Sequence, residues 1–166
     1  MLTVIYPYLS IRVKYSLMTE KVYKGCKIPL DLYYDIENQV WYKLEPDGTV
    51  RVGATDIGQT RAGKMVNVRI KAVGKYVQKG KPIASLESGK WTGPVPAIIE
   101  GEIVERNDLL FDTPELINED PYGRGWIARL KPAHLEKDLR DLLTGEEAFN
   151  KLKEYMDREG VECKGS

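Results

Sequence analysis

The feature that most constrains this chain is a succession of short strand-like segments, divided by glycine and proline, between residues 41 and 130. Segments 40–44 and 49–53 flank a Pro-Asp-Gly sequence, which supplies the turn of a β-hairpin. Residues 65–70 alternate apolar with polar side chains, as a strand does when one of its faces lies on a core. The pattern therefore predicts a β-rich body built from short strands.

Two more strands are predicted at residues 82–88 and 95–105. Pro96 and Gly101 interrupt the second of them. Proline cannot donate a hydrogen bond to a neighbouring strand, and glycine weakens a strand interior. We therefore expect a bend or an edge position in this segment.

Helices are predicted within and after the β-rich stretch. A short helix is predicted after Thr55 and Asp56, where either the hydroxyl or the carboxylate can serve as the N-cap, and it stops at Gly63. An amphipathic helix is predicted to begin at Pro132, and another opens with a capping box at residues 144–147 and stops at Gly160. The apolar side chains of these two C-terminal helices indicate core packing rather than a groove for a partner. They are Leu135, Leu139, Leu142, Leu143, Phe149, Leu152 and Met156.

Composition narrows the class of protein. With 166 residues, 42% of them hydrophobic, the chain is long enough for one domain with a sizeable core and too apolar for disorder. Its 25 basic and 25 acidic side chains give zero formal net charge, which removes the general electrostatic argument for binding nucleic acid or an anionic membrane. No stretch reaches the roughly 20 apolar residues of a membrane span. Residues 1–17 lack the features of a secretory signal and are either a loose leader or a translation start assigned too early.

Charge is balanced over the whole chain but not locally. Residues 61–90 hold eight basic side chains against Glu87 alone, and residues 100–120 hold eight acidic side chains against Arg106 alone. Such an asymmetry either steers a charged protein partner or is neutralised because the two stretches lie side by side. No aromatic residues interleave with the lysines in the manner of single-strand RNA binders, so nucleic acid is not expected as a partner.

The usual equipment of an enzyme is missing from the sequence. Cys26 and Cys163 are too few for a disulfide framework and have no metal-ligand spacing, so we expect free thiols in a reducing compartment. His134 has no nucleophile placed beside it in the sequence and is predicted to lie on the surface. The sequence contains no phosphate-binding glycine loop of a known pattern. We therefore predict a non-enzyme with no catalytic residues and no metal site.

Lys90 differs from the other lysines in its setting. Residues 87–91, Glu-Ser-Gly-Lys-Trp, separate two strand-like segments, and the glycine suits a tight turn that holds the lysine at a tip. An exposed lysine is usually only a solubilising charge. The order of features around this one, however, resembles the biotinyl/lipoyl attachment domain, in which the modified lysine occupies the tip of a β-hairpin. These features are residues 77–80, an apolar strand, the turn lysine, residues 94–96 and residues 101–104.

A longer stretch, from about residue 35 to residue 143, resembles the H protein of the glycine cleavage system. The spacing from Glu87 through Lys90 to Gly101 is the one that family keeps. The matching segments are residues 47–50, 52–56, 86–90, 101–107, 114–123 and 125–126.

This resemblance implies a β-rich (α+β) chain with the barrel-sandwich hybrid fold and C-terminal helices. It also implies a cytoplasmic carrier with lipoate attached covalently to Lys90. We divide the chain into an N-terminal extension, residues 1–30, a lipoyl-domain-like body, residues 31–132, and a C-terminal helical appendage, residues 133–166.

The chain departs from H proteins at residues that hold the aminomethyl cargo in that family. Where H proteins have Ser-His-Glu-Trp ahead of the first hairpin, this chain has Asn-Gln-Val-Trp at residues 38–41, and Pro94 replaces a further Asp. An aminomethyl group is a cation, so carboxylates or other acceptors must replace the water that it loses against a protein. Lysines also follow Gly63, Gly74 and Gly80, where H proteins tend to carry acids.

These changes resemble the lipoate-binding proteins associated with heterodisulfide-reductase-like sulfur oxidation, an offshoot of the H proteins. The likeness extends to residues 23–26, 63–66, 90–94 and 160–163. It implies that Lys90 carries a sulfur-containing intermediate between enzymes of such a system. The alternative is a glycine cleavage H protein that carries the aminomethyl group between the decarboxylase, the aminomethyltransferase and dihydrolipoamide dehydrogenase. Biotin carriage is disfavoured because Gly89 and Trp91 replace the usual flanking methionines, and an unmodified interaction domain is a further rival.

The neighbours of Lys90 receive roles only by this resemblance. Glu87 either helps a ligase to recognise the hairpin or solvates a strand end, and Trp91 either shields the arm or packs on the adjacent strand, which we favour. Ser88 and Gly89 complete the predicted cofactor-binding segment. Cys26 and Cys163 could exchange with the lipoyl sulfurs, but ordinary free thiols are preferred. The expected partners are a lipoate-protein ligase or lipoyl transferase, a heterodisulfide-reductase-like complex with sulfur-transfer proteins, and dihydrolipoamide dehydrogenase; neither nucleic acid nor a membrane is expected.

Overall fold

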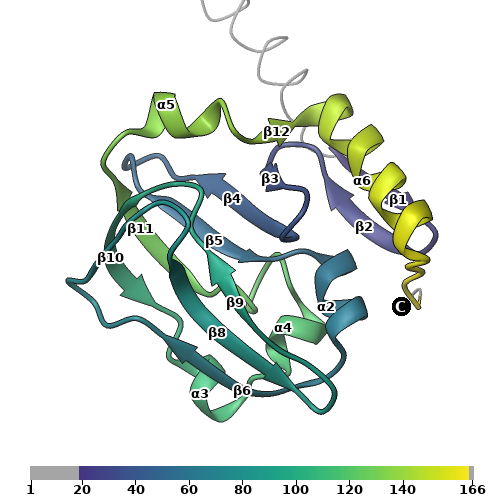
Figure 1. Cartoon of the computed structure of the whole chain (residues 1–166), viewed down its shortest axis with the longest axis horizontal. Coiled ribbons are helices and arrows are strands. Elements are labelled where there is room, and N and C mark those ends of the chain that lie inside the picture. The colour runs from purple at the N-terminus through teal and green to yellow at the C-terminus, as the bar shows by residue number, and fades with distance from the viewer. Residues whose placement is uncertain (1–18, 165–166) are drawn as a thin grey trace, which may run out of the picture.

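Two antiparallel sheets and a separate hairpin form the fold of residues 19–164, the part of the chain that our computed structural model describes (Figure 1). The seven-stranded sheet has the order β12-β3-β4-β5-β11-β10-β7, the three-stranded sheet has the order β6-β8-β9, and β1 pairs with β2. The strands are β1 (Glu20–Tyr23), β2 (Cys26–Pro29), β3 (Tyr33–Asp35), β4 (Val40–Leu44), β5 (Val50–Ala54), β6 (Met65–Ile70), β7 (Tyr76–Val77), β8 (Pro82–Ser88), β9 (Thr92–Pro96), β10 (Gly101–Arg106), β11 (Ala128–Pro132) and β12 (Leu143–Thr144). The helices are α2 (Asp56–Ala62), α3 (Leu109–Asp112), α4 (Leu116–Glu119), α5 (Leu135–Leu139) and α6 (Gly145–Glu159). The predicted β-rich class is confirmed.

The first hairpin forms as its turn residues predict. β4 pairs with β5, and the Asp47 carboxylate accepts a hydrogen bond from the Thr49 amide at 2.9 Å. Gly48 adopts a φ of 87°, a conformation that glycine reaches without strain. The Trp41 ring lies against Gly53, where a Cβ would come within 2.5 Å of it. Glycine therefore lets the tryptophan cover its partner strand.

The short helix after this hairpin is also confirmed. The Thr55 hydroxyl accepts a hydrogen bond from the Gly58 amide at 2.9 Å, as an N-cap residue does. The helix, α2, ends at Gly63, whose φ is 91°. α2 thus leads directly from the seven-stranded sheet into β6, the first strand of the three-stranded sheet.

The segment predicted as one interrupted strand, residues 95–105, is divided between the two sheets. β9 ends at Pro96 in the three-stranded sheet, and β10 begins at Gly101 in the seven-stranded sheet. A Cβ on Gly101 would overlap the carbonyl of Lys131 on β11, so a side chain has no room there. The predicted bend is confirmed, and it carries the chain from one sheet to the other.

The helix predicted from Pro132 is wrong in its extent. Residues 128–132 form β11, which pairs with β5 and β10, and α5 spans only Leu135–Leu139. The pairing of β11 is a tertiary effect that helical spacing within one segment cannot reveal. Leu142 does lie in the core, whereas Leu143 joins β12 opposite Tyr34.

α6 confirms its predicted apolar face and its end, but not its predicted cap. Phe149, Leu152 and Met156 are buried, and Gly160 ends the helix in the left-handed conformation. The Thr144 hydroxyl makes no hydrogen bond to the helix; it donates instead to the carbonyls of Leu30 and Leu32, at 3.3 and 2.7 Å. The capping box is therefore wrong, because a distant segment supplies acceptors that the local sequence does not show.

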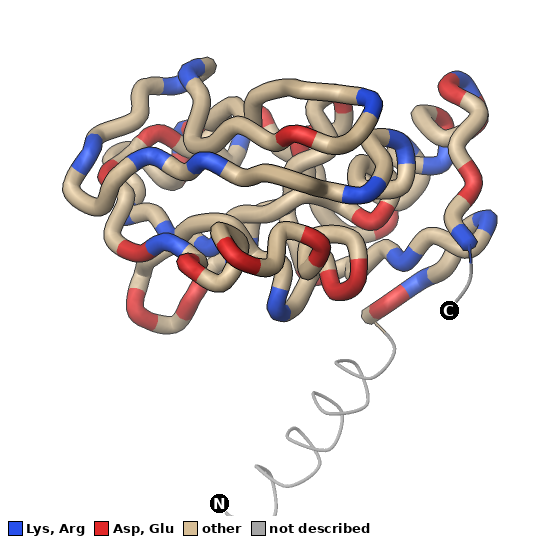
Figure 2. The backbone as a smooth tube through the Cα atoms, turned by 90° about the horizontal axis from the view of Figure 1, so that it is seen from below, with Lys and Arg blue, Asp and Glu red and all other residues tan. Residues whose placement is uncertain are grey.

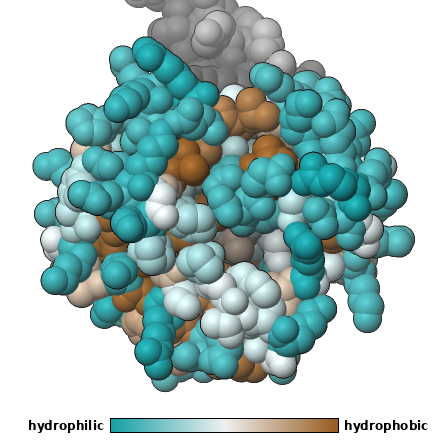
Figure 3. Space-filling view, viewed as in Figure 1, coloured by the Kyte–Doolittle hydropathy of each residue, from teal (hydrophilic) through white to brown (hydrophobic). Residues whose placement is uncertain are grey.

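Two apolar cores hold the fold together. One lies between the sheets and includes Val52, Ile83 and Ile103; the other lies under α6 and includes Trp41 and Leu152. These five side chains are almost completely buried, and each of the aliphatic ones stabilises the fold by about 1.5–3 kcal/mol relative to leaving it exposed. The face in Figure 3 is largely hydrophilic, with separate small apolar areas between polar side chains.

The hairpin of β1 and β2 belongs to the core under α6. Cys26 and Ile28 of β2 are buried in it with side chains of α6. The proposed leader, residues 1–17, lies outside the described residues, and the domain boundaries after residues 30 and 132 stay predictions. Within residues 19–164, no helix is long and apolar enough to span a membrane.

Candidate functional site

Lys90 lies at the tip of the hairpin formed by β8 and β9. The two strands are in register up to Glu87 opposite Thr92, and the Ser88 amide donates to the Trp91 carbonyl at 2.8 Å to close the turn. The Lys90 side chain is exposed. The predicted placement of this lysine at a hairpin tip is therefore confirmed.

Ser88 fixes the tip to the end of α2. Its side chain is buried, and its hydroxyl donates to the carbonyl of Ala62 at 2.6 Å and accepts from the Lys90 amide at 3.3 Å. Two segments far apart in the sequence are thus joined through one hydroxyl. The sequence indicated that Ser88 belongs to the site but not that it makes this connection.

The other neighbours of Lys90 differ in their exposure and in whether their surroundings require the residue type that is present. Gly89 has an ordinary negative φ, and a Cβ there would meet nothing within 4 Å, so its position needs no glycine for steric reasons. The Trp91 ring lies against Gly93, where no side chain would fit beneath it, and it remains 41% exposed. Glu87 is exposed on β8. Roles for these residues in binding a cofactor stay predictions.

A cavity of about 550 Å³ opens beside the tip, with Lys90 and Trp91 in its wall. Residues 38–40, which precede the first hairpin, and Pro94 of β9 also line it. The departures from the H-protein pattern at residues 38–40 and 94 therefore meet in one cavity, whereas the lysines after Gly63, Gly74 and Gly80 are not among its lining residues. Its remaining lining residues are Glu37, Ala54, Gly58, Arg61, Ala62, Met65, Leu86, Val95 and Tyr155.

The Lys90 side chain lies over Gly63, at the end of α2. A Cβ built on Gly63 would stand 3.0 Å from Lys90 Cε, which is tighter than most contacts of this kind. Gly63 also has a φ of 91°, so the position suits glycine for two reasons. The sequence predicted Gly63 as a helix stop but gave no sign of this contact with the lysine.

Apart from Lys90, the charged groups of the cavity wall, Glu37 and Arg61, are paired with residues of α6. Glu37 accepts from Arg158 at 3.2 Å, and Arg61 donates to Glu159 at 3.2 Å and to the Tyr155 hydroxyl at 2.6 Å. α6 therefore closes one side of the cavity through Tyr155 and two ion pairs. Its contribution was missed in the sequence, because helical spacing marks the buried face of α6 without showing what it covers.

The polar residues ahead of the first hairpin are also engaged. The Asn38 amide group donates to Asp35 at 2.8 Å. Gln39 accepts from the Thr55 hydroxyl at 2.5 Å and donates to the carbonyl of Ile36 at 2.7 Å. These bonds hold the wall in place through the N-cap of α2. Within the described residues, the cavity wall thus presents no carboxylate without a basic partner.

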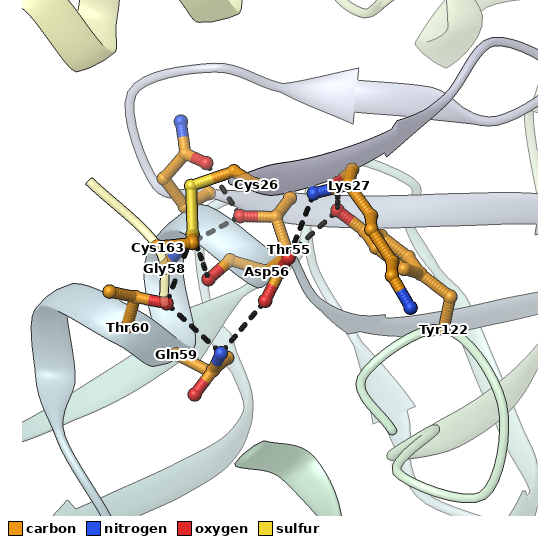
Figure 4. Close-up of a disulfide and its surroundings, with 10 residues drawn as sticks. Cys26, Lys27, Thr55, Asp56, Gly58, Gln59, Thr60, Tyr122 and Cys163 are labelled. Carbon is orange, nitrogen blue, oxygen red and sulfur yellow. Dashed lines mark hydrogen bonds between the residues drawn. A yellow bond between two sulfur atoms is a disulfide. The ribbon is translucent and has the colours of Figure 1, made fainter. Parts of the chain in front are cut away.

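Cys26 and Cys163 form a disulfide, so the prediction of free thiols is wrong (Figure 4). Their Cα atoms are 4.8 Å apart although 137 residues separate them in the chain. The Cys163 amide donates to the carbonyl of Lys24 at 2.9 Å, which brings the C-terminal tail beside the β1–β2 hairpin. Such a pairing depends on how both chain ends pack and cannot be read from cysteine spacing.

The disulfide rests on α2, the helix that ends below Lys90. The Thr60 hydroxyl donates to Cys163 Sγ at 3.1 Å (Figure 4). At the start of α2, the Tyr122 hydroxyl donates to the carbonyl of Lys27 and accepts from the Asp56 amide, at 2.7 and 3.0 Å. Burial raises the pKa of Tyr122, so this hydroxyl keeps its proton at neutral pH. The start of α2 is thus bonded to β2 through Tyr122, and Thr60 in its last turn is bonded to the C-terminal tail.

His134 lies on the surface, as predicted, 3.8 Å from a carboxylate oxygen of Glu100. Residues 19–164 bring together no group of three or more histidine, cysteine, aspartate or glutamate side chains that could hold a metal ion.

Comparison with known proteins points in one direction. The profile of the family described as glycine cleavage H-protein matches residues 32–155. "Glycine cleavage system H protein 2" of Aquifex aeolicus is 74% identical over 148 residues, which cover 88% of this chain and 92% of that protein. "Probable glycine cleavage system H protein 2" of Saccharolobus solfataricus is 50% identical over 145 residues, covering 86% and 97%. The crystal structure of a glycine cleavage system H protein from Mycobacterium marinum has 33% sequence identity and a TM-score of 0.66, over 80% of this chain and 99% of that one. The expected barrel-sandwich fold is confirmed by this likeness.

Proposed function

Because the chain belongs to the glycine cleavage H-protein family, whose members are lipoyl carriers and not enzymes, we propose that it is a carrier with its lipoyl arm on Lys90. One observation carries the choice of residue: Lys90 is exposed at the tip of the β8–β9 hairpin and borders the cavity of about 550 Å³. An exposed amine is open to the ligase or transferase that must supply the acyl group, and a bordering cavity offers the attached chain a place to rest.

The residues present fit such a group. Ser88 ties the tip to Ala62, and Gly63 leaves room for the side chain of Lys90. Val40 and Met65, both buried, give part of the cavity an apolar wall, as a hydrocarbon chain with a sulfur ring requires. When bound, the lipoyl group supplies a pair of sulfurs for thiol-disulfide exchange. The protein positions this pair and holds it at high effective concentration for successive enzymes.

The test of attachment is a peptide map. Protein made in cells that lipoylate their own carriers is expected to gain the mass of one lipoyl group, located on the peptide that contains Lys90. A mass gain on a peptide with another lysine would show that the arm is attached there. No mass gain in such cells would support the rival interpretation of an unmodified interaction domain.

Gly63→Ala is expected to slow lipoylation, because the new Cβ pushes on Lys90 and φ is unfavourable. The backbone strain alone costs about 1–3 kcal/mol of unfolding free energy. Gly74→Ala is the matched control: its φ is 92°, but its Cβ would meet nothing within 4 Å. We would measure thermal unfolding and the rate at which a lipoate-protein ligase modifies each variant. Equal slowing in both variants would show that the contact with Lys90 is irrelevant.

The cargo that the relatives' names favour is the aminomethyl group. Relatives that are 74%, 54% and 50% identical all bear the name of the glycine cleavage system. In this role the arm would visit the glycine decarboxylase, the aminomethyltransferase and dihydrolipoamide dehydrogenase. This is the first candidate for the function of the loaded arm.

The cavity wall favours a second candidate, a sulfur-containing cargo handled by a heterodisulfide-reductase-like system and sulfur-transfer proteins. Val40 and Pro94 stand in the cavity where H proteins carry acids, and Glu37 is paired with Arg158. A cationic cargo would therefore find no unpaired carboxylate among the described lining residues. An uncharged or anionic sulfur cargo needs none.

The two candidates are separated by loading the same lipoylated protein in parallel. One sample receives glycine and glycine decarboxylase, and the other receives a persulfide donor with a sulfur-transfer protein. Mass spectrometry of the Lys90 peptide reports which group arrives. Loading from glycine alone would remove the sulfur candidate, and loading with sulfur alone would remove the aminomethyl candidate.

Pro94→Asp is expected to make the protein a better aminomethyl carrier whichever candidate holds. Pro94 is exposed at the cavity, so an aspartate there would offer an unpaired carboxylate to the cation without a large burial penalty. We expect the lifetime of the aminomethyl-loaded protein to rise about tenfold, as one charge-assisted hydrogen bond worth about 1.5 kcal/mol allows. Thr92→Asp, on the same strand but outside the lining residues, is the control and should change little. An equal rise in both variants would point to a general charge effect.

A further inference from the structure

Four basic side chains, Lys64, Arg69, Lys71 and Lys75, form a row that we call the basic strip. All four are exposed, and none has an ion-pair partner within residues 19–164. In Figure 2, blue segments recur along the strand that crosses the middle of the view, and red segments gather below it. The acidic stretch of residues 100–120 lies beside these cations, since the Ile103 amide donates to the Lys75 carbonyl at 2.8 Å, but within the described residues it forms no ion pair with the strip.

The strip begins beside the Lys90 tip. Lys64 directly precedes Met65, which is paired with Ser88 next to the turn. Arg69 is paired with Ser85, and the Lys71 amide donates to the carbonyl of Ile83 at 3.0 Å. From Lys64 to Lys71 the row spans about 23 Å at the usual rise of a strand. A surface that binds along it would receive the hairpin tip at one end.

Apolar side chains accompany the cations. Val66 lies between Lys64 and Arg69 and is 56% exposed, and Val73 lies between Lys71 and Lys75 and is 57% exposed. Trp91, at the tip, is 41% exposed. Cations with solvent-facing apolar side chains between them are the composition of a protein interface, in which apolar contacts lie among charged ones. A single-stranded nucleic acid would be met by cations interleaved with stacking aromatics, whereas the large exposed apolar side chains between the first and last cations of the strip are the valines at positions 66 and 73.

Protection of a sheet edge does not account for the strip. β6 is an edge strand, and lysines on such strands do hinder unwanted pairing. However, Lys71 lies beyond the end of β6, Lys75 lies beside β7 at the edge of the other sheet, and an exposed valine at position 66 would weaken protection of the β6 edge.

We propose that the basic strip docks an acidic surface beside the active-site entrance of the enzyme that loads the arm, and so aims Lys90 into that site. The proposal rests on the assignment of the arm to Lys90 and adds to it the surface and the charge of the partner. Complementary charge raises the rate of encounter by about 10–10³ at low ionic strength, and salt screens the effect within about 10 Å at 0.1 M. The strip should therefore govern the rate of loading and its dependence on salt.

The test compares two triple variants of the lipoylated full chain. The first reverses the strip, with Lys64→Glu, Arg69→Glu and Lys71→Glu. The second, the control, carries Lys27→Glu, Lys43→Glu and Lys131→Glu on β2, β4 and β11, outside the three-stranded sheet; these lysines are exposed and have no ion pair within the described part of the chain. Each protein is loaded by the enzyme that succeeds in the parallel loading assay, and kcat/KM is measured from low to high salt.

We expect strip reversal to lower kcat/KM at least about tenfold at low salt while kcat is kept, and to abolish the fall of the wild-type rate with added salt. The control should stay within about twofold of the wild type. Equal rates for the strip variant and the wild type, or an equal loss in both triple variants, would overturn the proposal. Tighter binding of the wild type to single-stranded RNA than to the loading enzyme, lost on strip reversal, would assign the strip to nucleic acid instead. Failure of the wild type to acquire a lipoyl group is recorded separately by intact mass and would count against the function, not the strip.

Discussion

Lys90→Arg is expected to yield a folded protein that has no lipoyl arm and transfers no cargo. Arginine keeps the positive charge at the tip, but its guanidinium is not the primary amine that a lipoate-protein ligase acylates. Lys90 is exposed, so unfolding free energy should change by less than about 0.5 kcal/mol. Intact mass should show no lipoyl group, and the rate of cargo transfer should fall to the background of the assay.

Lys81→Arg is the control for this experiment. Lys81 is an exposed lysine that also follows a glycine in a turn, yet it lies outside the residues that line the cavity. It should be lipoylated and loaded like the wild type. A mass gain that survives Lys90→Arg would place the arm elsewhere, and cargo transfer without any mass gain would mean that the protein does not act through a lipoyl arm.

The position of Lys90 at a hairpin tip was predictable because its signals are local. Two strand-like segments with a glycine and a lysine between them define a hairpin tip, and the structure places Lys90 there. The hairpin of β4 and β5 and the helix α2 were predictable for the same reason, since turn residues and an N-cap threonine act within a few residues.

The cavity was not predictable, because its walls come from distant parts of the chain. Glu37, Arg61 and Tyr155 lie in a loop, in α2 and in α6, and only tertiary packing brings them together. The same cause explains the errors near the C-terminus. β11 owes its form to pairing with β5 and β10, and the Thr144 hydroxyl bonds to the carbonyl of Leu32 rather than to its own helix.

The charge pattern was only partly predictable from the sequence. The sequence revealed both charged stretches but left open whether they cancel. The structure places them side by side, because β10 pairs with β7 and α3 packs against β6, yet among the described residues no ion pair joins the basic strip to the acidic stretch. Where the charged stretches of a sequence lie on the protein surface can thus be stated only when the strand order is known.

Removing the disulfide between Cys26 and Cys163 is expected to lower the free energy of unfolding by several kcal/mol. Closing a loop of 137 residues restricts the unfolded chain, and the chain-entropy estimate for this length is about 5 kcal/mol. Replacing Cys26 and Cys163 together with alanine should therefore lower the free energy of unfolding by about 3–5 kcal/mol. The midpoint of thermal unfolding should fall by about 10 °C or more. Denatured protein that has not been reduced should show no titratable thiol, since the sequence has these two cysteines alone.

Val161→Ala separates the bond from the packing of the tail around it. Val161 is buried in the core under α6, next to Cys163, so its truncation loosens the same tail and leaves the disulfide in place. We expect it to cost about 1–2 kcal/mol, clearly less than the cysteine pair. Wild-type protein unfolded in the presence of a reductant should match the double alanine variant once the lost side-chain packing is allowed for. Identical unfolding of oxidised and reduced wild type would show that the bond contributes nothing, and the tail would then be held by the packing of Val161 and by hydrogen bonds such as that from the Cys163 amide to the Lys24 carbonyl.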